Sequence, residues 1–348
     1  MSHPRLSLVL DAPEALPASG RIAVYRAIAA TDLSDLPKER LQIIQGFAPD
    51  HAALVARGYD VVPVASGDFA AAVVFLPRAK AEARALLAEA AARVAPGGPI
   101  WVDGAKHDGV DSILKDLRAR VPVSPAIAKA HGKIFSFAAD ADALADWTAQ
   151  AGEPAPGFRT LPGVFSADGV DRGSALLAEC LPAKLPGRVA DLGAGWGWLS
   201  AQVLTHAGVA SLDLIEAEHS ALDCAKLNIS DPRARFIWAD ATQFVPETRY
   251  MAIVMNPPFH TQRAADPGLG AAFIRAAAGM LSLSGTMYMV ANRHLPYEDA
   301  LRASFHEIEE IGGDSAFKVI RAAKPIPAGK APAATAPASR RRAPRPRG

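Results

Sequence analysis

Two short motifs in the chain have residue types suited to handling a nucleobase and a nucleotide-like cofactor. Residues 256–259 read Asn-Pro-Pro-Phe and follow the apolar run Tyr250–Met255. An amide, two rigid imino residues and an aromatic ring at a strand end can grip an amino group and stack on a planar ring. Upstream, Asp191 begins the sequence Asp-Leu-Gly-Ala-Gly-Trp-Gly, a turn that can hold an adenosine-bearing cofactor in an α/β fold. Together the motifs predict methyl transfer onto a nucleobase.

The chemistry of an exocyclic amine explains why an amide followed by prolines suits it. The amine's lone pair is delocalised into the ring, so a site must hold both N–H bonds and leave the lone pair facing the methyl donor. We expect the Asn256 amide oxygen and the Pro257 carbonyl to accept one N–H each, and Phe259 to stack on the ring. The rigidity of Pro257 and Pro258 preorganises these acceptors, so positioning provides most of the acceleration and no general base is needed before transfer.

Four polar residues fall where consecutive predicted strands end. Asp191, Glu216, Asp240 and Asn256 are spaced by 25, 24 and 16 positions. The carboxyl ends of adjacent strands form the crevice in which open α/β sheets bind ligands. We expect Glu216 to accept hydrogen bonds from ribose hydroxyls and Asp240 to accept one from an adenine amino group. The cofactor-binding residues predicted in this way are Asp191, Gly193, Ala194, Gly195, Gly197, Glu216 and Asp240.

A nicotinamide dehydrogenase is the competing interpretation of the glycine-rich turn. Gly193 and Gly195, followed by an acid at Glu216, satisfy half of the dinucleotide fingerprint, but its third glycine would fall at Trp198. A tryptophan there blocks the close approach of helix to strand that glycine permits. Adding Gly197 gives a Gly-x-Gly-x-Gly spacing that suits S-adenosyl-L-methionine, and hydride transfer does not call for Asn-Pro-Pro-Phe. We therefore expect S-adenosyl-L-methionine as the cofactor.

The carboxyl-terminal half alternates short apolar runs with amphipathic stretches, which is typical of a parallel, doubly wound α/β sheet. The expected strands cover 188–191, 211–216, 235–240, 250–255 and 286–291. A helix is expected over 271–281 and a short one near 297–305, and 306–311 with 317–320 predict a closing hairpin. A seven-stranded, mostly parallel sheet with a terminal antiparallel hairpin is the class I methyltransferase pattern.

The amino-terminal half repeats this organisation without its motifs. Residues 72–77, a helix over 78–94 and residues 100–103 parallel the later series, but no glycine-rich turn follows an early strand, and Phe75-Leu-Pro-Arg78 stands in place of Asn-Pro-Pro-Phe. We therefore predict two tandem Rossmann-like domains, of which the first is degenerate and neither binds cofactor nor reacts. The expected boundaries are 1–150 for the degenerate domain, 151–159 for a linker, 160–324 for the catalytic domain and 325–348 for a disordered basic tail.

Length and composition agree with a two-domain enzyme. The 348 residues predict two domains of roughly 150–170 residues each. Cys180 and Cys224 share no metal-ligand spacing, so no metal site and no disulfide framework is expected. No apolar run has the length of a membrane span, and the N-terminus lacks a basic segment followed by an apolar core. We expect a cytoplasmic, monomeric enzyme.

The net charge of +1 conceals an acidic body and a basic tail. Eight of the 37 basic residues lie in 321–348, where there is no acid, so 29 bases face 36 acids and residues 1–320 carry a net charge of −7. Six prolines and no aromatic residue in 325–348 predict disorder, because such a segment buries too little surface to offset chain entropy. Its arginines suit phosphate contacts on RNA, and a solubilising tail without a partner is the alternative.

The strings around these motifs resemble the small-subunit ribosomal RNA guanine-N2 methyltransferases of the RsmC type. The resemblance covers nearly all of 160–323 and is carried by 160–174, 256–260, 290–297 and 317–322. It implies methylation of a guanine amino group in 16S ribosomal RNA, with ribosomal RNA or the small ribosomal subunit as the partner. It also implies that Phe165 lies over the cofactor pocket, whereas an ordinary buried anchor is the alternative for this residue. Trp196 and Trp198 are bulkier than the residues usual around the cofactor loop of the family.

Other functions remain open from the residues alone. Asn-Pro-Pro-Phe by itself also admits methylation of a large-subunit guanine, of DNA adenine or of protein glutamine, and only the flanking strings favour small-subunit guanine. A non-catalytic alternative is an RNA-binding assembly factor built on a degenerate methyltransferase fold. The intact glycine-rich turn with Glu216, Asp240 and Asn256 in one half argues against that alternative.

The charge distribution generates a prediction about the tail. Deleting residues 325–348 should weaken RNA binding and flatten its salt dependence, because each lost phosphate contact removes about 0.9 from the slope of log affinity against log salt on duplex, or about 0.7 on single strands. The turnover number at saturating RNA should hardly change. Binding titrations of both proteins across a salt series measure the slopes, and equal slopes would leave the tail as a solubilising extension.

Overall fold

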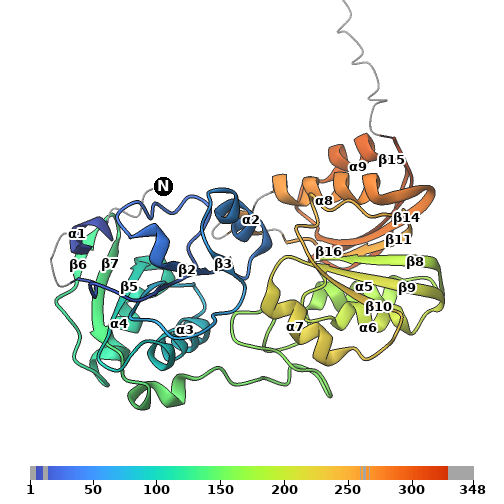
Figure 1. Ribbon diagram of the computed structural model, residues 1–348. Helices are drawn as coiled ribbons and strands as arrows, with labels where there is room; N and C mark the ends of the chain where they lie inside the picture. The colour runs from blue at the N-terminus through green and yellow to red at the C-terminus, as the bar shows by residue number, and fades with distance from the viewer. Residues whose placement is uncertain (1–4, 11–14, 259, 262–263, 266, 328–348) are drawn as a thin grey trace, which may run out of the picture.

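The structure is a computed structural model that describes residues 5–10, 15–258, 260–261, 264–265 and 267–327. It consists of two α/β units placed side by side, with helices α2 and α7 facing each other where the units meet (Figure 1). Each unit has an apolar core on both faces of its sheet. Most of the expected basic tail lies outside the described residues.

The first unit is built on a sheet with strand order β3-β2-β1-β4-β5-β7-β6 within the described residues. Strand β7 runs antiparallel to β5 and β6, and all other neighbours are parallel. The strands are β1 (Ile22–Tyr25), β2 (Leu41–Ile44), β3 (Val61–Val62), β4 (Ala71–Phe75), β5 (Pro99–Ala105), β6 (Ile127–Lys129) and β7 (Gly132–Ala138). The α-helices are α1 (Ser7–Leu10), α2 (Ala48–Ala56), α3 (Lys80–Arg93) and α4 (Val110–Arg118).

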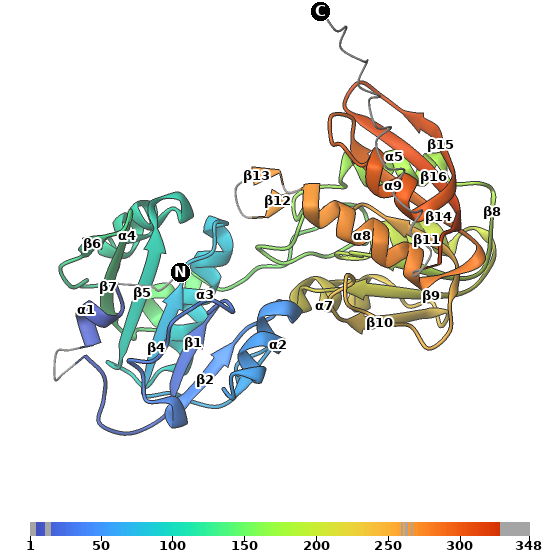
Figure 2. The ribbon, with the colours of Figure 1, turned by 90° about the horizontal axis from the view of Figure 1, so that it is seen from above.

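The second unit has the strand order β10-β9-β8-β11-β14-β16-β15, and β16 is the strand that runs antiparallel to its neighbours. Its strands are β8 (Lys184–Leu192), β9 (Ala207–Glu216), β10 (Ala234–Trp238), β11 (Tyr250–Met255), β14 (Leu281–Asn292), β15 (Phe305–Gly313) and β16 (Phe317–Pro325). Its helices are α5 (Arg172–Cys180), α6 (Trp198–Leu204), α7 (His219–Asn228), α8 (Pro267–Met280) and α9 (Glu298–Ser304). A separate two-stranded element, β12 (His260–Thr261) with β13 (Ala264–Ala265), follows β11 (Figure 2).

The two sheets have the same order when β1 is matched with β8 and the later strands in sequence, which confirms the prediction of two tandem domains of one fold. The correspondence extends to the turn after the first strand. Arg26 follows β1 with φ of 60°, and Gly193 follows β8 with φ of 77°. The N–H of Arg26 donates to Ile44 O and that of Gly193 to Ile215 O, each across to the neighbouring strand. The backbone bend is thus retained in the first unit although its glycine is absent.

Several expected element boundaries differ from those of the structure, and two of the differences concern β10 and β16. Strand β10 ends at Trp238 and not at Asp240, because the Asp240 carboxylate accepts the Thr242 N–H at 2.8 Å and starts a turn. Strand β16 continues to Pro325, and Ile326 N donates to Ser304 O at 2.9 Å. The first residue of the expected tail, Pro325, therefore belongs to the sheet, and a deletion that begins at residue 328 spares both the strand and the bond of Ile326.

The units meet through the turns that follow two corresponding strands, β2 and β9. Ala48 N donates to Ala217 O at 2.8 Å, and His219 N donates to Gly46 O at 2.9 Å. Phe47 and Glu218 form the antiparallel bridge between these two bonds. Each turn thus donates one backbone N–H to the other turn and accepts one from it. The two units are therefore related locally by an approximate two-fold axis.

Side chains surround this reciprocal pairing. The Trp238 indole N–H donates to Gly46 O at 2.9 Å and Ala217 O at 2.8 Å. Arg26 of the first unit pairs with Glu82 at 2.7 Å, and burial beside these residues raises the pKa of Glu218 to about 7, with Arg26 opposing the shift. The boundary is therefore a packed, charged contact that fixes the turn after β9.

Gly46 provides a test of this contact. A Cβ at Gly46 would lie 2.8 Å from Glu218 Oε1 and 3.6 Å from the Cβ of His219. Gly46→Val should therefore displace the Glu218 carboxylate, destabilise the protein by about 1 kcal/mol, the lower end for overpacking, and lower the midpoint of thermal unfolding. Gly279→Val is the matched control, because nothing lies within 4 Å of a Cβ there. Calorimetry that finds equal midpoints for the two variants would contradict the role given to the contact.

Candidate functional site

The predicted site residues gather at the carboxyl edge of the second sheet. A pocket there is lined by Phe165, Ser166, Asp171, Ser174, Asp191, Gly193, Ala194, Gly195, Trp196, Trp198, Leu199 and Asn256. It brings together the glycine-rich turn, Asn256 and Phe165. Glu216 and Asp240 are not among the residues that line this pocket, and Glu216 contacts the turn through Gly195 N. The site thus has a polar end at Asn256 and a backbone-lined end at the glycines.

The glycine-rich turn needs glycine for two different reasons. Gly197 has φ of 89°, and a Cβ there would lie 2.9 Å from Ile229 Cδ1 and 3.2 Å from the Cβ of Ala225. It is also the residue from which α6 starts. Gly195 has nothing within 4 Å of its Cβ position, so its backbone borders open space in the pocket. Gly197 thus allows helix α7 to pack closely against the turn, whereas Gly195 leaves room for a ligand.

Asp191 is the most unusual acid of the pocket. Its side chain is 1% exposed, and its Oδ2 accepts from the Ser200 hydroxyl at 2.7 Å. Its Oδ1 has no hydrogen-bond partner among the described residues. Burial raises the pKa of Asp191 to about 7, with the Ser200 bond opposing the shift and Glu216 adding to it. A buried acceptor without a partner calls for a ligand donor.

Glu216 holds the glycine-rich turn through a hydrogen bond to its backbone. Its Oε2 accepts the Gly195 N–H at 2.8 Å, and its Oε1 accepts the Glu218 N–H at 2.8 Å. Burial raises the pKa of Glu216, and these backbone donors oppose the shift. One carboxylate therefore links the cofactor turn to the turn that contacts the first unit.

Asp240 lies beyond the end of β10, and one of its carboxylate oxygens accepts hydrogen bonds within the same turn. Its Oδ1 accepts from both Thr242 N at 2.8 Å and Thr242 Oγ1 at 2.7 Å. Ala239 N donates to Glu216 O at 3.0 Å, so this turn is held beside the end of β9. The expected neighbourhood of Glu216 and Asp240 is therefore present.

Asn256 is held in one orientation by the start of helix α5. Its Nδ2 donates to Asp171 Oδ2 at 2.7 Å and to Ser174 Oγ at 3.0 Å. With both amide hydrogens engaged, Oδ1 is the polar atom left for a ligand. Pro257 is buried and Pro258 exposed, and Phe259 lies outside the described residues.

Sequence reasoning missed the residues that support these groups. Asp171 caps α5 by accepting Ser174 N at 2.8 Å, and its Asp-x-x-Ser spacing is a signal for a helix start. That signal could have located the cap but not its contact with Asn256. Trp196, noted only as bulky, is 4% exposed and anchors the pocket's cover, since its indole donates to Phe165 O at 3.1 Å.

Phe165 lies on the segment that covers the pocket. Its side chain is 60% exposed, so its interpretation as an ordinary buried anchor was wrong. The next residue, Ser166, has φ of 53°, and its hydroxyl donates to Gly169 O at 2.7 Å. The backbone carbonyl of Phe165 is held by the Trp196 indole. Its exposed ring lies at the rim of the pocket.

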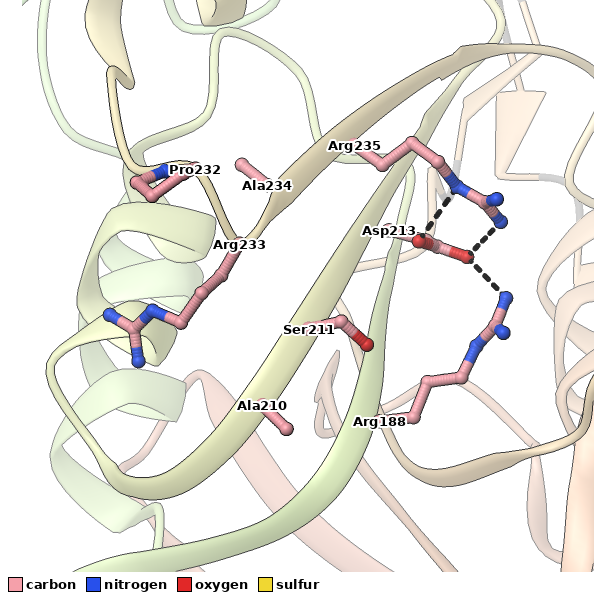
Figure 3. Close-up of a pocket in the computed structure, with 8 residues that line it drawn as sticks. All are labelled: Arg188, Ala210, Ser211, Asp213, Pro232, Arg233, Ala234 and Arg235. Carbon is pink, nitrogen blue, oxygen red and sulfur yellow. Dashed lines mark hydrogen bonds and ion pairs between the residues drawn. The ribbon is translucent and has the colours of Figure 1, made fainter.

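A second pocket in the same unit is structural. It lies nearer the amino ends of the strands, where Figure 3 shows Arg188 and Arg235 converging on Asp213. Asp213 accepts from Arg188 at 2.9 Å, from Arg235 at 2.8 Å and from the Tyr250 hydroxyl at 2.6 Å. Arg233 points away from Asp213 (Figure 3), and it pairs with Asp231 at 2.6 Å. The arginines that line this pocket are thus engaged by carboxylates, and the arrangement pins β8, β9, β10 and β11 together.

The described residues lack two kinds of feature. No cluster of three or more His, Cys, Asp or Glu side chains could hold a metal ion there. No helix in that part of the chain is long and apolar enough to cross a membrane.

Comparisons with known proteins identify the family. Residues 156–321 match the methyltransferase small domain, and residues 46–149 match the methyltransferase small domain N-terminal family. A structure titled as the T. thermophilus 16S rRNA N2 G1207 methyltransferase (RsmC) in complex with AdoMet and guanosine has a TM-score of 0.74 and 22% identity, and the match covers 92% of each chain. That likeness shows the same fold over both units.

The sequence relatives carry one name. Ribosomal RNA small subunit methyltransferase C of Shewanella piezotolerans is 30% identical over 261 residues, which cover 72% of this chain and 76% of the relative. The protein of the same name from Psychromonas ingrahamii is 29% identical over 259 residues, with 71% and 74% covered. The chain therefore belongs to the ribosomal RNA small subunit methyltransferase C family.

Proposed function

We propose that the chain methylates the exocyclic amino group of a guanine in small-subunit ribosomal RNA, with S-adenosyl-L-methionine as the methyl donor. The observation that carries this proposal is the Asn256 carboxamide, which is held through its amino group beside the pocket of Asp191 and the glycine-rich turn. The names of the relatives support the RNA substrate. A related fold described with AdoMet and guanosine supports the cofactor and the base.

The pocket residues fit such a cofactor. The unpartnered Asp191 Oδ1 can accept from its ammonium group, and the open space at Gly195 allows backbone contact. Glu216 would accept from the ribose hydroxyls and Asp240 from the adenine amino group. Gly193, Ala194 and Gly197 would shape the turn, with Phe165 covering the pocket. When bound, S-adenosyl-L-methionine supplies a methyl group activated by its positive sulfur.

Asn256 would orient the amine that receives the methyl group. Its Oδ1 and the Pro257 carbonyl each accept one N–H, so the amine's lone pair faces the donor. The lone pair forms the new C–N bond while the S–C bond breaks with its electrons remaining on sulfur. The amine becomes cationic during transfer and afterwards gives up a proton to water. Acceptors aimed at the amine therefore bind the transition state more tightly than the substrate.

The first unit would neither bind cofactor nor react. Leu76 and Pro77 follow β4 where Asn256 and Pro257 follow the corresponding strand β11, and Leu76 is 7% exposed within the core. No amide is available at that position. We propose 1–150 as the non-catalytic domain, 151–159 as the linker and 160–324 as the catalytic domain.

Replacing Asn256 tests the proposed function. Cells without the gene should lack one N2-methylguanosine in small-subunit ribosomal RNA, and the wild-type gene should restore it. With purified protein, Asn256→Ala should lower the methylation rate by about two to three orders of magnitude, the scale for one preorganised contact, and leave cofactor affinity nearly unchanged. Mass mapping of nucleosides and cofactor titration make the two measurements.

Other results would change the proposal in defined ways. Unaltered ribosomal RNA in cells without the gene would favour another amino substrate or a non-catalytic assembly factor. A parallel loss of rate and cofactor affinity in Asn256→Ala would make this residue part of the cofactor site.

The buried Asp191 predicts how stability depends on pH. Its folded pKa of about 7 lies above the unfolded value of 3.8, so its contribution is fully present below about pH 4 and is lost as pH rises to 7, at about 1.4 kcal/mol per pKa unit. Relative to wild type, Asp191→Asn should therefore become more stable between pH 5 and pH 8 in the absence of cofactor. Denaturant unfolding at both pH values measures this difference, and a pH-independent difference would contradict the raised pKa.

A further inference from the structure

We infer that Asp171 is a positioning residue for methyl transfer, which orients the Asn256 carboxamide and strengthens its oxygen as an acceptor. The inference rests on the proposed function and adds a residue that lies 85 positions before Asn256 in the chain. The fold brings them together because α5 starts at the carboxyl edge where β11 ends.

The hydrogen bonds leave one orientation for the carboxamide. Asp171 Oδ2 accepts from Asn256 Nδ2 at 2.7 Å, and Ser174 Oγ accepts a second bond from the same nitrogen at 3.0 Å. An ionised carboxylate can only accept, so the amino group of Asn256 faces Asp171 and Oδ1 faces the opposite way. Turning the amide over would replace a charge-assisted bond with two oxygens in contact.

With the carboxamide reversed, Asn256 could not accept a hydrogen bond from the substrate amine. It would present the Asn256 amino group to the substrate amine, so that N–H groups would face N–H groups. The substrate amine would lose one of the two acceptors that set its lone pair. If Asn256 is fixed before the substrate binds, this acceptor is not lost. A displacement of about 1 Å in a group that orients a substrate can lower the rate 100-fold.

The charge of Asp171 adds a second effect. A hydrogen bond from an amide nitrogen to an anion polarises the amide and increases the negative charge on its oxygen. Because the substrate amine becomes cationic during transfer, a more negative Oδ1 stabilises the transition state more than the ground state. Asp171 therefore acts through Asn256 and not on the substrate.

Capping of α5 alone does not account for the arrangement. The bond from Ser174 N to Asp171 Oδ2 at 2.8 Å already provides the cap, and asparagine caps helices as well as aspartate does. Asp171→Asn therefore keeps the cap and the shape of the side chain. It removes the charge that polarises the Asn256 amide. Because Oδ2 accepts from both Ser174 N and Asn256 Nδ2, the capping oxygen of the asparagine remains an uncharged acceptor for Asn256.

The test compares Asp171→Asn with Asp140→Asn, a control in which another carboxylate that accepts the backbone N–H three residues later, that of Ala143, is changed in the first unit. Asp171→Asn should lower kcat by about 10- to 100-fold, with KM for RNA, the cofactor dissociation constant and the unfolding midpoint close to wild type. Asp140→Asn should leave all four unchanged. In the Asn256→Ala background, Asp171→Asn should have no further effect on kcat.

A spectroscopic measurement separates this inference from the proposed function. The side-chain amide signals of Asn256, assigned by their loss in Asn256→Ala, should shift in Asp171→Asn and stay in place in Asp140→Asn, whatever the substrate is. Unchanged signals together with unchanged kcat would overturn the inference. An additional loss of kcat in the Asn256→Ala background would also overturn it, because Asp171 would then act by another route.

Discussion

The Glu216 carboxylate is the interaction on which the arrangement of the molecule depends. One oxygen accepts from Gly195 in the cofactor turn and the other from Glu218, whose bridge with Phe47 lies at the contact between the units. A single side chain thus connects the pocket with the first domain. Two hydrogen bonds to Glu216 lie between the glycine-rich turn and Glu218 at the contact.

The carboxyl edges of the two sheets differ in the space and the polar groups that they offer a ligand. In the second unit the carboxyl ends of the strands leave room for a ligand beside Gly195, and the buried Oδ1 of Asp191 has no partner among the described residues. In the first unit Leu76 fills the core after β4, and Arg26 sits in the bent turn after β1, where it pairs with Glu82 near Glu218. The turn after β1 thus takes part in the contact between the units, whereas the turn after β8 borders the pocket.

The sequence was sufficient for much of the fold and for part of the site. Apolar runs and the glycine-rich turn predicted the strands, the order of the site residues and the duplication, because these follow from local patterns. The contact of Asp171 with Asn256 depends on where α5 starts against β11, which no local pattern states. The end of β10 and the extent of β16 depended on a capping bond at Asp240 and a backbone bond at Ile326. The bulk of Trp196 was visible, but its bond to Phe165 required the tertiary structure.

The central claim is that one of the two similar domains has kept a cofactor site. Calorimetric titration of the intact chain with S-adenosyl-L-methionine tests it most directly. The account predicts one molecule bound per chain, and none bound by Gly195→Leu, whose side chain would enter the pocket. Two molecules per chain, or binding that survives Gly195→Leu, would contradict it.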